Sequence, residues 1–162
     1  MAAASLVATA FGIVIIIITA YVLAGSTLVT SEVVSTAQKD MTDLQLKMLG
    51  TSMEVVANSS GGSPLTIEIL NTGREPIRNF GYIDVYLYDS SSGWFLFTYR
   101  SEPAEGHWTD VSITDGDYTE EKIYRNQWDP GEILNMSVSY SGITPERFKI
   151  VTGNGIPNSY KE

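Results

Sequence analysis

The hydrophobic and polar positions of the chain follow three patterns in succession, and the first is a long apolar run. From Leu6 to Val29 nearly every position is apolar, and no residue before Glu32 carries a charged side chain. As a helix this segment spans about 36 Å, whereas a bilayer core needs about 20 apolar residues. Residues 13–18 are aliphatic on every face, while a soluble helix keeps a polar stripe. The pattern predicts a membrane-spanning helix.

The anchor residues that we predict are large apolar side chains within this run. They are Leu6, Phe11, Ile13, Ile15, Ile16, Ile17, Ile18, Tyr21 and Leu23. The alternative is a cleaved signal peptide, which has a shorter apolar core and a basic region before it. This sequence has no basic residue before Lys39. We therefore expect the helix to be retained.

The second pattern is amphipathic. Val33, Ala37, Met41, Leu44 and Met48 follow one another at spacings of four, four, three and four, which places them on one helical face. The same helix is therefore expected to continue to about residue 46. This second half either packs against another helix or caps the following domain, and both can hold together.

The third pattern begins near residue 50, where apolar and polar residues alternate with a period of two. The alternation predicts strands at 52–57, 65–69, 83–88, 94–99, 122–125, 133–138 and 148–152, the last of these closing the domain, with a short strand at 111–113 in an otherwise irregular segment 100–120. Turn-forming residues separate them at 58–64, 71–73, 89–93 and 129–131. Short strands at this spacing are typical of a sandwich. We predict a mainly β protein: one transmembrane helix within residues 1–49, followed by an immunoglobulin-like antiparallel β-sandwich over 50–162.

Composition limits the partners, the chemistry and the location that we expect for this sandwich. The 162 residues include 10 Lys and Arg against 19 Asp and Glu, a net charge of -9, all of it after residue 30. Such an acidic domain repels nucleic acid. The absence of Cys excludes disulfides, thiolate metal sites and cysteine nucleophiles. Two Asn-x-Ser sequons, at Asn58 and Asn135, are candidate glycosylation sites, and together with the acidity they favour a domain outside the cell.

The sequence offers little for catalysis. His107 is the one histidine, and we expect it in a solvated loop. The nucleophile elbow, the phosphate-binding loop and the zinc-protease motif are all absent. The acidic stretch 110–121 fits a solvated loop, with a weak cation site as the alternative, although its spacing differs from that of an EF-hand. We expect no enzymatic activity, cofactor, metal or small-molecule substrate.

The aromatic hairpin of residues 82–99 is more informative. Ile83, Val85 and Leu87 alternate with Tyr86 and Tyr88, so one face of the first strand serves the core and the other carries tyrosines. In the second strand both faces are apolar, and Trp94 belongs to the outer one. An apolar outer face implies cover by another chain or by the segment 100–120. Tyr86, Tyr88 and Trp94 are the candidate interface, because Tyr and Trp commonly anchor protein contacts.

Four stretches together resemble a known family. They are the uncharged start at residues 1–10 leading into the aliphatic helix, Asn-Thr-Gly at 71–73, Asp-Pro-Gly-Glu at 129–132, and Phe-Lys-Ile-Val-Thr-Gly-Asn-Gly at 148–155. The chain resembles the archaellin-related accessory proteins of the archaeal flagellum, or archaellum, of the FlaF and FlaG type. The resemblance implies a helix in the cell membrane and a sandwich outside it, in the pseudoperiplasm. It also implies a stator role, with a surface-layer protein, other archaellum components and further copies of the chain as partners.

A pilin-like filament subunit is the alternative, with the helix packed in the core of an extracellular filament. Archaellins and pilins usually begin with a short basic leader that ends in Gly. Because no Lys or Arg precedes residue 39, we expect an unprocessed membrane anchor.

Overall fold

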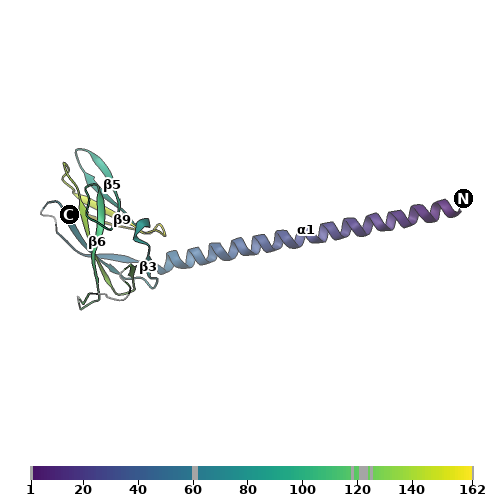
Figure 1. Cartoon of the computed structure of the whole chain (residues 1–162), viewed down its shortest axis with the longest axis horizontal. Coiled ribbons are helices and arrows are strands. Elements are labelled where there is room, and N and C mark those ends of the chain that lie inside the picture. The colour runs from purple at the N-terminus through teal and green to yellow at the C-terminus, as the bar shows by residue number, and fades with distance from the viewer. Residues whose placement is uncertain (1, 60–61, 118, 121–123, 125, 162) are drawn as a thin grey trace. The chain divides into compact units, whose positions relative to one another are not determined.

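The structure, a computed structural model, describes residues 2–59, 62–117, 119–120, 124 and 126–161, with side chains from residue 7 onward. Two compact units make up the chain, Met1–Asp43 and Leu44–Glu162. Helix α1 (Ala2–Gly50) is unbroken and confirms the predicted N-terminal helix (Figure 1). It ends at Gly50, one turn beyond the residue 46 expected from periodicity, so its last residues belong to the second unit.

Ten strands and one short 3-10 helix follow in the described part of the chain. They are β1 (Met53–Ser59), β2 (Leu65–Asn71), β3 (Ile77–Arg78), η1 (Phe80–Tyr82), β4 (Asp84–Asp89), β5 (Gly93–Tyr99), β6 (His107–Thr114), β7 (Gln127–Trp128), β8 (Ile133–Ser139), β9 (Arg147–Val151) and β10 (Pro157–Lys161). The mainly β fold after one helix is therefore confirmed.

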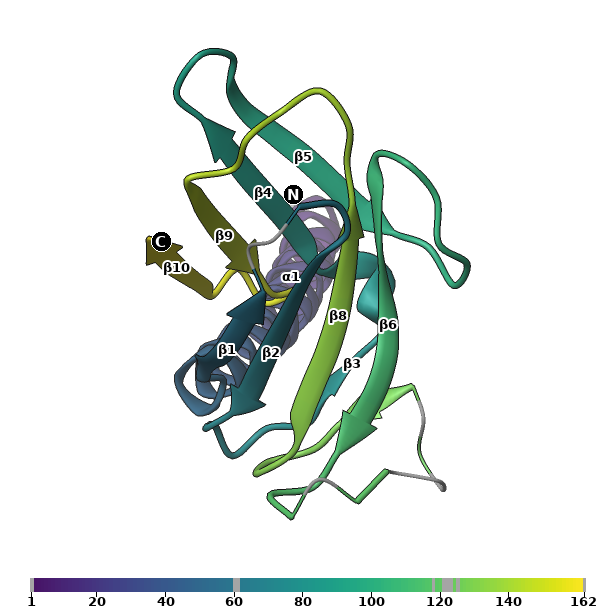
Figure 2. The same ribbon diagram turned by 90° about the vertical axis from the view of Figure 1, so that its left-hand side faces the viewer.

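Eight of these strands form one sheet in the order β1-β2-β8-β6-β5-β4-β9-β10, and β3 pairs with β7 beside it. The sheet folds over into two layers, β1-β2-β8-β6 and β5-β4-β9-β10 (Figure 2). The layers are joined at β5 and β6, which pair in parallel through Thr98–His107 and Tyr99–Trp108, while the other neighbours are antiparallel. At the open side Asn158 Nδ2 donates to the carbonyl of Met53 at 2.7 Å, so the sandwich is nearly closed.

The core lies between the two layers and is filled by the alternate residues of each strand. Its members include Ile67, Ile69, Val85, Leu87, Trp108, Trp128, Leu134, Met136, Val138 and Ile150, all fully buried. Trp108 and Trp128 are the largest of them, and the indole Nε1 of Trp108 donates to the carbonyl of Ile83 at 3.0 Å. Burial of alternate side chains on both inner faces is what an aligned sandwich requires.

Some strand predictions were wrong. Residues 107–114 form the eight-residue strand β6, not an irregular segment with a short strand at 111–113. His107 therefore lies in a strand, half-buried, with Nδ1 3.1 Å from Thr98 Oγ1, rather than in a solvated loop. The predicted last strand at 148–152 is followed by β10. The strand predicted at 122–125 falls largely outside the described residues, since 122, 123 and 125 are not described.

Two of the stretches that carry the resemblance are joined by hydrogen bonds. The side-chain amide of Asn71 donates to the carbonyls of Glu75 and Trp128, both at 3.1 Å, and its backbone N–H donates to Glu132 at 2.9 Å. These bonds join the 71–73 turn to the 129–132 turn. From the stretch at 148–155, Asn154 Nδ2 donates to Thr51 Oγ1 at 3.1 Å.

The last turn of α1 is bound to the 71–75 segment. The carbonyl of Gly50 accepts from the backbone N–H groups of Arg74 at 2.7 Å and Glu75 at 3.2 Å, and Ser52 O accepts from Gly73 at 3.0 Å. These bonds satisfy carbonyls that a helix end otherwise leaves open. A Cβ at Gly73 would lie 2.4 Å from Gly50 O, so this approach requires glycine.

Candidate functional site

The first functional element is the apolar half of α1. The described side chains of the predicted anchor are all exposed: Phe11, Ile13, Ile15, Ile16, Ile17, Ile18, Tyr21 and Leu23. Leu6 lies in the helix, but its side chain is outside those described. Within the described residues, α1 is the one helix long and apolar enough to cross a membrane.

Several hydroxyl groups in this helix donate hydrogen bonds to carbonyls of the helix itself. Thr19 Oγ1 donates to the carbonyl of Ile15 at 2.7 Å, Thr27 Oγ1 to that of Leu23 at 3.0 Å, and Thr30 Oγ1 to that of Ser26 at 2.8 Å. A hydroxyl bonded to a carbonyl one turn earlier adds no unpaired polar group. These positions are therefore compatible with lipid, where unsatisfied polar groups are costly.

The second functional element is the outer face of the β4–β5 hairpin. Tyr88 pairs with Trp94 across the two strands, and Tyr86 pairs with Leu96. The rings of Tyr88 and Trp94 lie with their centroids 5.1 Å apart in a tilted arrangement. The structure thus brings the three predicted interface residues onto one face, as the alternation indicated.

This aromatic surface continues into a cationic one on the next strands. In β9 Arg147 pairs with Tyr88 and Lys149 with Tyr86, and in β10 Lys161 pairs with Arg147. The guanidinium carbon of Arg147 lies 5.6 Å from the centroid of the Tyr88 ring, within cation–π range. We define the cationic–aromatic face as these six residues with Leu96: Tyr86, Tyr88, Trp94, Leu96, Arg147, Lys149 and Lys161.

The proposed cover by residues 100–120 is not present. Much of that segment is β6, which continues the sheet beyond β5 and belongs to the other layer. Trp94 keeps 54% of its surface exposed and Leu96 keeps 51%. The outer face of the hairpin is therefore open in the described part of this chain, and Tyr86 and Tyr88 are half-buried by their neighbours in the sheet.

The two sequons lie in different environments. Asn58 is the penultimate residue of β1, and the third sequon position, Ser60, is outside the described residues. Asn135 lies in the middle of β8, between Glu68 of β2 and Ser112 of β6, with its Oδ1 buried and unbonded. Glycosylation of both asparagines stays a prediction.

Two side chains have pKa values shifted from their ordinary values. Hydrogen bonds from Ser91, Thr144 and Ser92 lower the pKa of Asp89 to about 2, the Ser91 hydroxyl contributing most. Burial, aided by the hydrogen bond from its hydroxyl to Asp110 at 2.7 Å, raises the pKa of Tyr99 to about 12. The hydrogen bonds of Asp89 hold the loops at Ser91 and Thr144, and the hydrogen bond of Tyr99 joins β5 to β6.

The acidic stretch 110–121 is not one solvated loop: residues 110–114 belong to strand β6, and a turn follows them at 116–117. Asp115 Oδ1 accepts from the backbone N–H groups of Asp117 at 3.0 Å and Thr119 at 2.8 Å, and Glu121 lies outside the described residues. Among the described residues, no three His, Asp or Glu side chains are grouped as a metal would require.

Comparisons with solved structures identify what this architecture resembles. No protein-family model matches the chain, and no curated protein sequence matches it closely. The archaellum periplasmic stator protein FlaG from Sulfolobus acidocaldarius superposes with a TM-score of 0.52 at 20% identity, covering 69% of this chain and 99% of that one. The chain has the fold of an archaellum protein. In the FlaF–FlaG stator complex of the same organism, the match has a TM-score of 0.51 at 19% identity over 68% of this chain and 87% of that one.

A filament gives a longer match. The archaeal flagellum of Methanospirillum hungatei strain JF1 superposes with a TM-score of 0.65 at 14% identity, covering 95% of this chain and 90% of that one. Because the second unit begins at Leu44, a match of this extent includes much of α1 as well as the sandwich. The resemblance to archaellum proteins noted in the sequence thus extends to the fold of both parts.

Proposed function

We propose that the protein is a structural, non-enzymatic component of the archaellum, anchored in the cell membrane by α1 with its sandwich outside. The observation that carries this is the combination of an apolar helix with a sandwich that matches FlaG over 99% of that chain. The net charge of -9, the absence of Cys and the two sequons support placement of the sandwich in the pseudoperiplasm.

In this role the sandwich holds the stationary part of the motor in place by binding a surface-layer protein or another archaellum subunit. The cationic–aromatic face supports such a contact, because its exposed Trp94 and Leu96 offer apolar area to a partner. The FlaF–FlaG stator complex is an assembly of two such proteins, which supports partners of the same kind here.

A filament subunit is the second candidate function. The match to the Methanospirillum hungatei filament over 95% of this chain favours it, since the similarity there includes the helix. In this role α1 leaves the lipid for a bundle of neighbouring helices. The exposed aliphatic residues on every side of α1 suit either surrounding.

The location and intact mass of the protein in its own cells separate these roles. As a stator it should be extracted from membranes with residues 1–20 intact, and deletion of its gene should leave filaments assembled but immobile. As a filament subunit it should be recovered in sheared filaments, and deletion should remove them. Recovery in the cytosol, or normal swimming after deletion, contradicts both.

The partner contact has its own test. Tyr88→Ala combined with Trp94→Ala should abolish binding of the full chain to isolated surface layer while leaving its β-type circular dichroism unchanged. Val111→Ala is the matched control, because Val111 is 59% exposed but lies on β6 in the other layer. Unchanged binding by the double variant would exclude the hairpin as the contact.

A further inference from the structure

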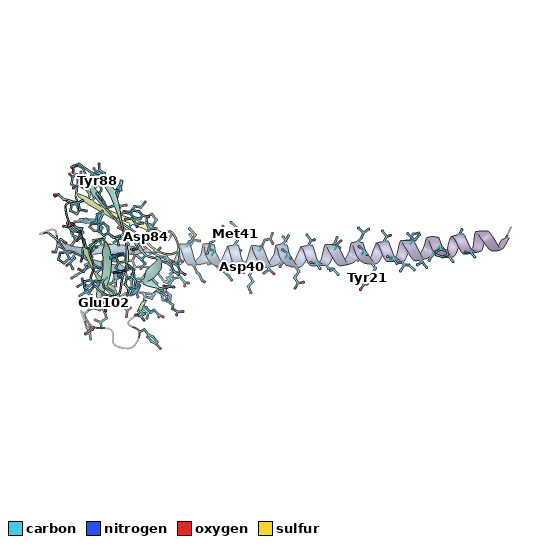
Figure 3. The ribbon with its side chains drawn as sticks, turned by 45° about the horizontal axis from the view of Figure 1, so that its top comes forward. Tyr21, Asp40, Met41, Asp84, Tyr88 and Glu102 are labelled. Atoms are coloured by element: carbon cyan, nitrogen blue, oxygen red, sulfur yellow. The ribbon has the colours of Figure 1, made fainter. Side chains whose placement is uncertain are left out.

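The two outer faces of the sandwich carry opposite charge. On the cationic–aromatic face, Arg147, Lys149 and Lys161 lie together on β9 and β10. Among the described residues of β4, β9 and β10, the one acid on this face is Asp84, which pairs with Val151 at the far end of β4 from Tyr88 (Figure 3). This face is therefore net positive, on a protein whose net charge is -9.

The outer face of β1-β2-β8-β6 is the reverse. Register places Glu54 beside Leu70, and places Glu68 between Ala57 and Asn135. The remaining outward positions include the hydroxyl-bearing Thr66 and Ser137 and the exposed apolar Val56 and Val111. The described residues of these four strands include no Lys or Arg, and His107 at the margin is the one other titratable side chain facing outward. We call this surface the acidic face.

We propose that copies of this sandwich pack front to back, with the cationic–aromatic face of one copy docked on the acidic face of the next. In this arrangement Arg147 and Lys149 approach Glu54 and Glu68, and Trp94 and Leu96 lie over the small residues Ala57, Thr66 and Ser137. The contact goes beyond the proposed function, since it is available equally to a stator component and to a filament subunit.

Charge favours this packing over a face-to-face dimer. A symmetric dimer through the cationic–aromatic face would bring two sets of Arg147, Lys149 and Lys161 together, and one through the acidic face would oppose Glu54 and Glu68. Like charges placed opposite each other at an interface are unfavourable. A front-to-back contact joins unlike surfaces, and unless the rotation closes a ring it produces an open row of copies.

The size of the faces sets the strength of the contact. Four strands at about 4.8 Å spacing and five residues at ~3.3 Å each give a flat area of roughly 320 Å². A standard interface buries about 800 Å² per partner. A single contact is therefore weak. Copies anchored in one membrane raise each other's effective concentration, and this makes a weak contact sufficient.

The first test is zero-length cross-linking of the full chain in vesicles of neutral lipid. A carbodiimide condenses a Lys amine with an Asp or Glu carboxylate, and mixing unlabelled with nitrogen-15-labelled chains marks the links between copies. We expect links from Lys149 or Lys161 of one copy to Glu54 or Glu68 of another, and a ladder of products beyond the dimer. Links elsewhere, or none between copies, would overturn the proposal.

The second test is a pair of charge reversals. Arg147→Glu with Lys149→Glu reverses the charge of the cationic–aromatic face and is called the front variant. Glu54→Lys with Glu68→Lys reverses the charge of the acidic face and is called the back variant. With either variant alone, the yield of cross-linked products should fall about tenfold, since the two faces in contact then carry like charges. A mixture should restore the ladder, because the intact cationic–aromatic face of one variant meets the intact acidic face of the other, and the two reversed faces also carry opposite charges. Arg74→Glu with Arg100→Glu is the charge-matched control and should keep the ladder.

Other outcomes identify a different contact between copies. A dimer that persists in the back variant but not in the front variant indicates a symmetric contact, and a ladder unaffected by either indicates association through α1. Association that strengthens with salt indicates an apolar contact rather than a charged one. An Asn135 glycan would lie on the acidic face and block it, so Asn135 must be unmodified in interacting copies. Each contrary result rejects front-to-back packing while leaving the archaellum role to its own tests.

Discussion

At the scale of single residues, short polar side chains fix the loops of this sandwich. Asp89 ends β4 and holds two loops at once, because Oδ1 accepts from the backbone of Ser91 at 2.7 Å and Oδ2 accepts from the backbone of Thr144 at 2.7 Å. The residue is 5% exposed. Its low pKa follows from these donors, which favour the carboxylate over the neutral acid.

The stability of the protein should therefore depend on the ionisation of Asp89. Its folded pKa of about 2 lies below the unfolded value of 3.8, so the stabilisation is present above pH 3.8 and lost as the pH falls through 2. Asp89→Asn turns an amide N–H toward the Thr144 donor and should lower the urea midpoint at pH 7, but not below pH 2. Urea titrations from pH 7 to 1.5 measure this. Asp117→Asn, in an exposed turn, should change little; an equal effect from it would contradict the assignment.

The residue level was only partly predictable from the sequence. Alternation within the hairpin placed Tyr86, Tyr88 and Trp94 on one face, because a strand has a strict period of two. Arg147 and Lys149 were not foreseen beside them. They come from a strand distant in sequence, and no local pattern specifies which strand becomes the neighbour of β4.

At the scale of elements, strand predictions succeeded where one face of the strand is buried and the other is not, and failed where the two faces do not differ in this way. β2 alternates between core and outer face throughout, β8 does so from Leu134 onward, and both were predicted. β6 was underestimated, because adjacent Trp108 and Thr109 are both buried and a bulge follows Asp110, which breaks the alternation. β10 is mostly exposed, so its sequence carries no apolar period.

The close approach at Gly73 gives a prediction for the joint after α1. In Gly73→Ala the new Cβ would lie 2.4 Å from Gly50 O and 2.7 Å from Ser52 N, both backbone atoms that cannot simply rotate away. We expect a loss of about 1–3 kcal/mol in the free energy of unfolding. Gly116→Ala is the control, since nothing lies within 4 Å of its Cβ position. Chemical denaturation of both variants decides it, and equal midpoints would refute a tight joint.

The two halves of α1 should respond differently to a charge. Met41 and Asp40 project to different sides of the helix, as expected of a segment with a polar side, while Tyr21 belongs to the apolar half (Figure 3). Ile16→Arg should reduce membrane integration, because an Arg at a helix centre costs about 2.5–3.5 kcal/mol. Val33→Arg, also at an exposed apolar position, should leave integration unchanged. Resistance to alkaline extraction measures both, and equal behaviour would place the bilayer elsewhere.

At the scale of the whole molecule, the division into units does not fall where the sequence changes period. Alternation begins near residue 50, but the second compact unit begins at Leu44. The sequence could not place this boundary, because the helical pattern of Met41, Leu44 and Met48 continues unchanged through it.

Two fragments of the chain test this boundary. Residues 44–162 and residues 51–162 should both fold as soluble β domains, since the core lies entirely beyond residue 51. The shorter fragment loses the bonds at Gly50 and should unfold at a lower temperature, by about 4 °C per kcal/mol lost for a domain of this size. Thermal melting followed by circular dichroism compares them. Identical melting would show that the last helical turn adds nothing to the domain.

The joint at Gly50 also determines how the protein carries mechanical load. A pull transmitted along α1 reaches the sandwich at two places at once, at the start of β1 and at the 73–75 backbone that donates to Gly50 and Ser52. Through Asn71 that backbone is bound to the 128–132 turn, which leads into β8 in the centre of its layer. Tension is therefore shared with an interior strand, and β1 at the margin of its layer does not have to bear it alone. A helix attached in this way can carry a load without the edge strand β1 detaching from the sheet first.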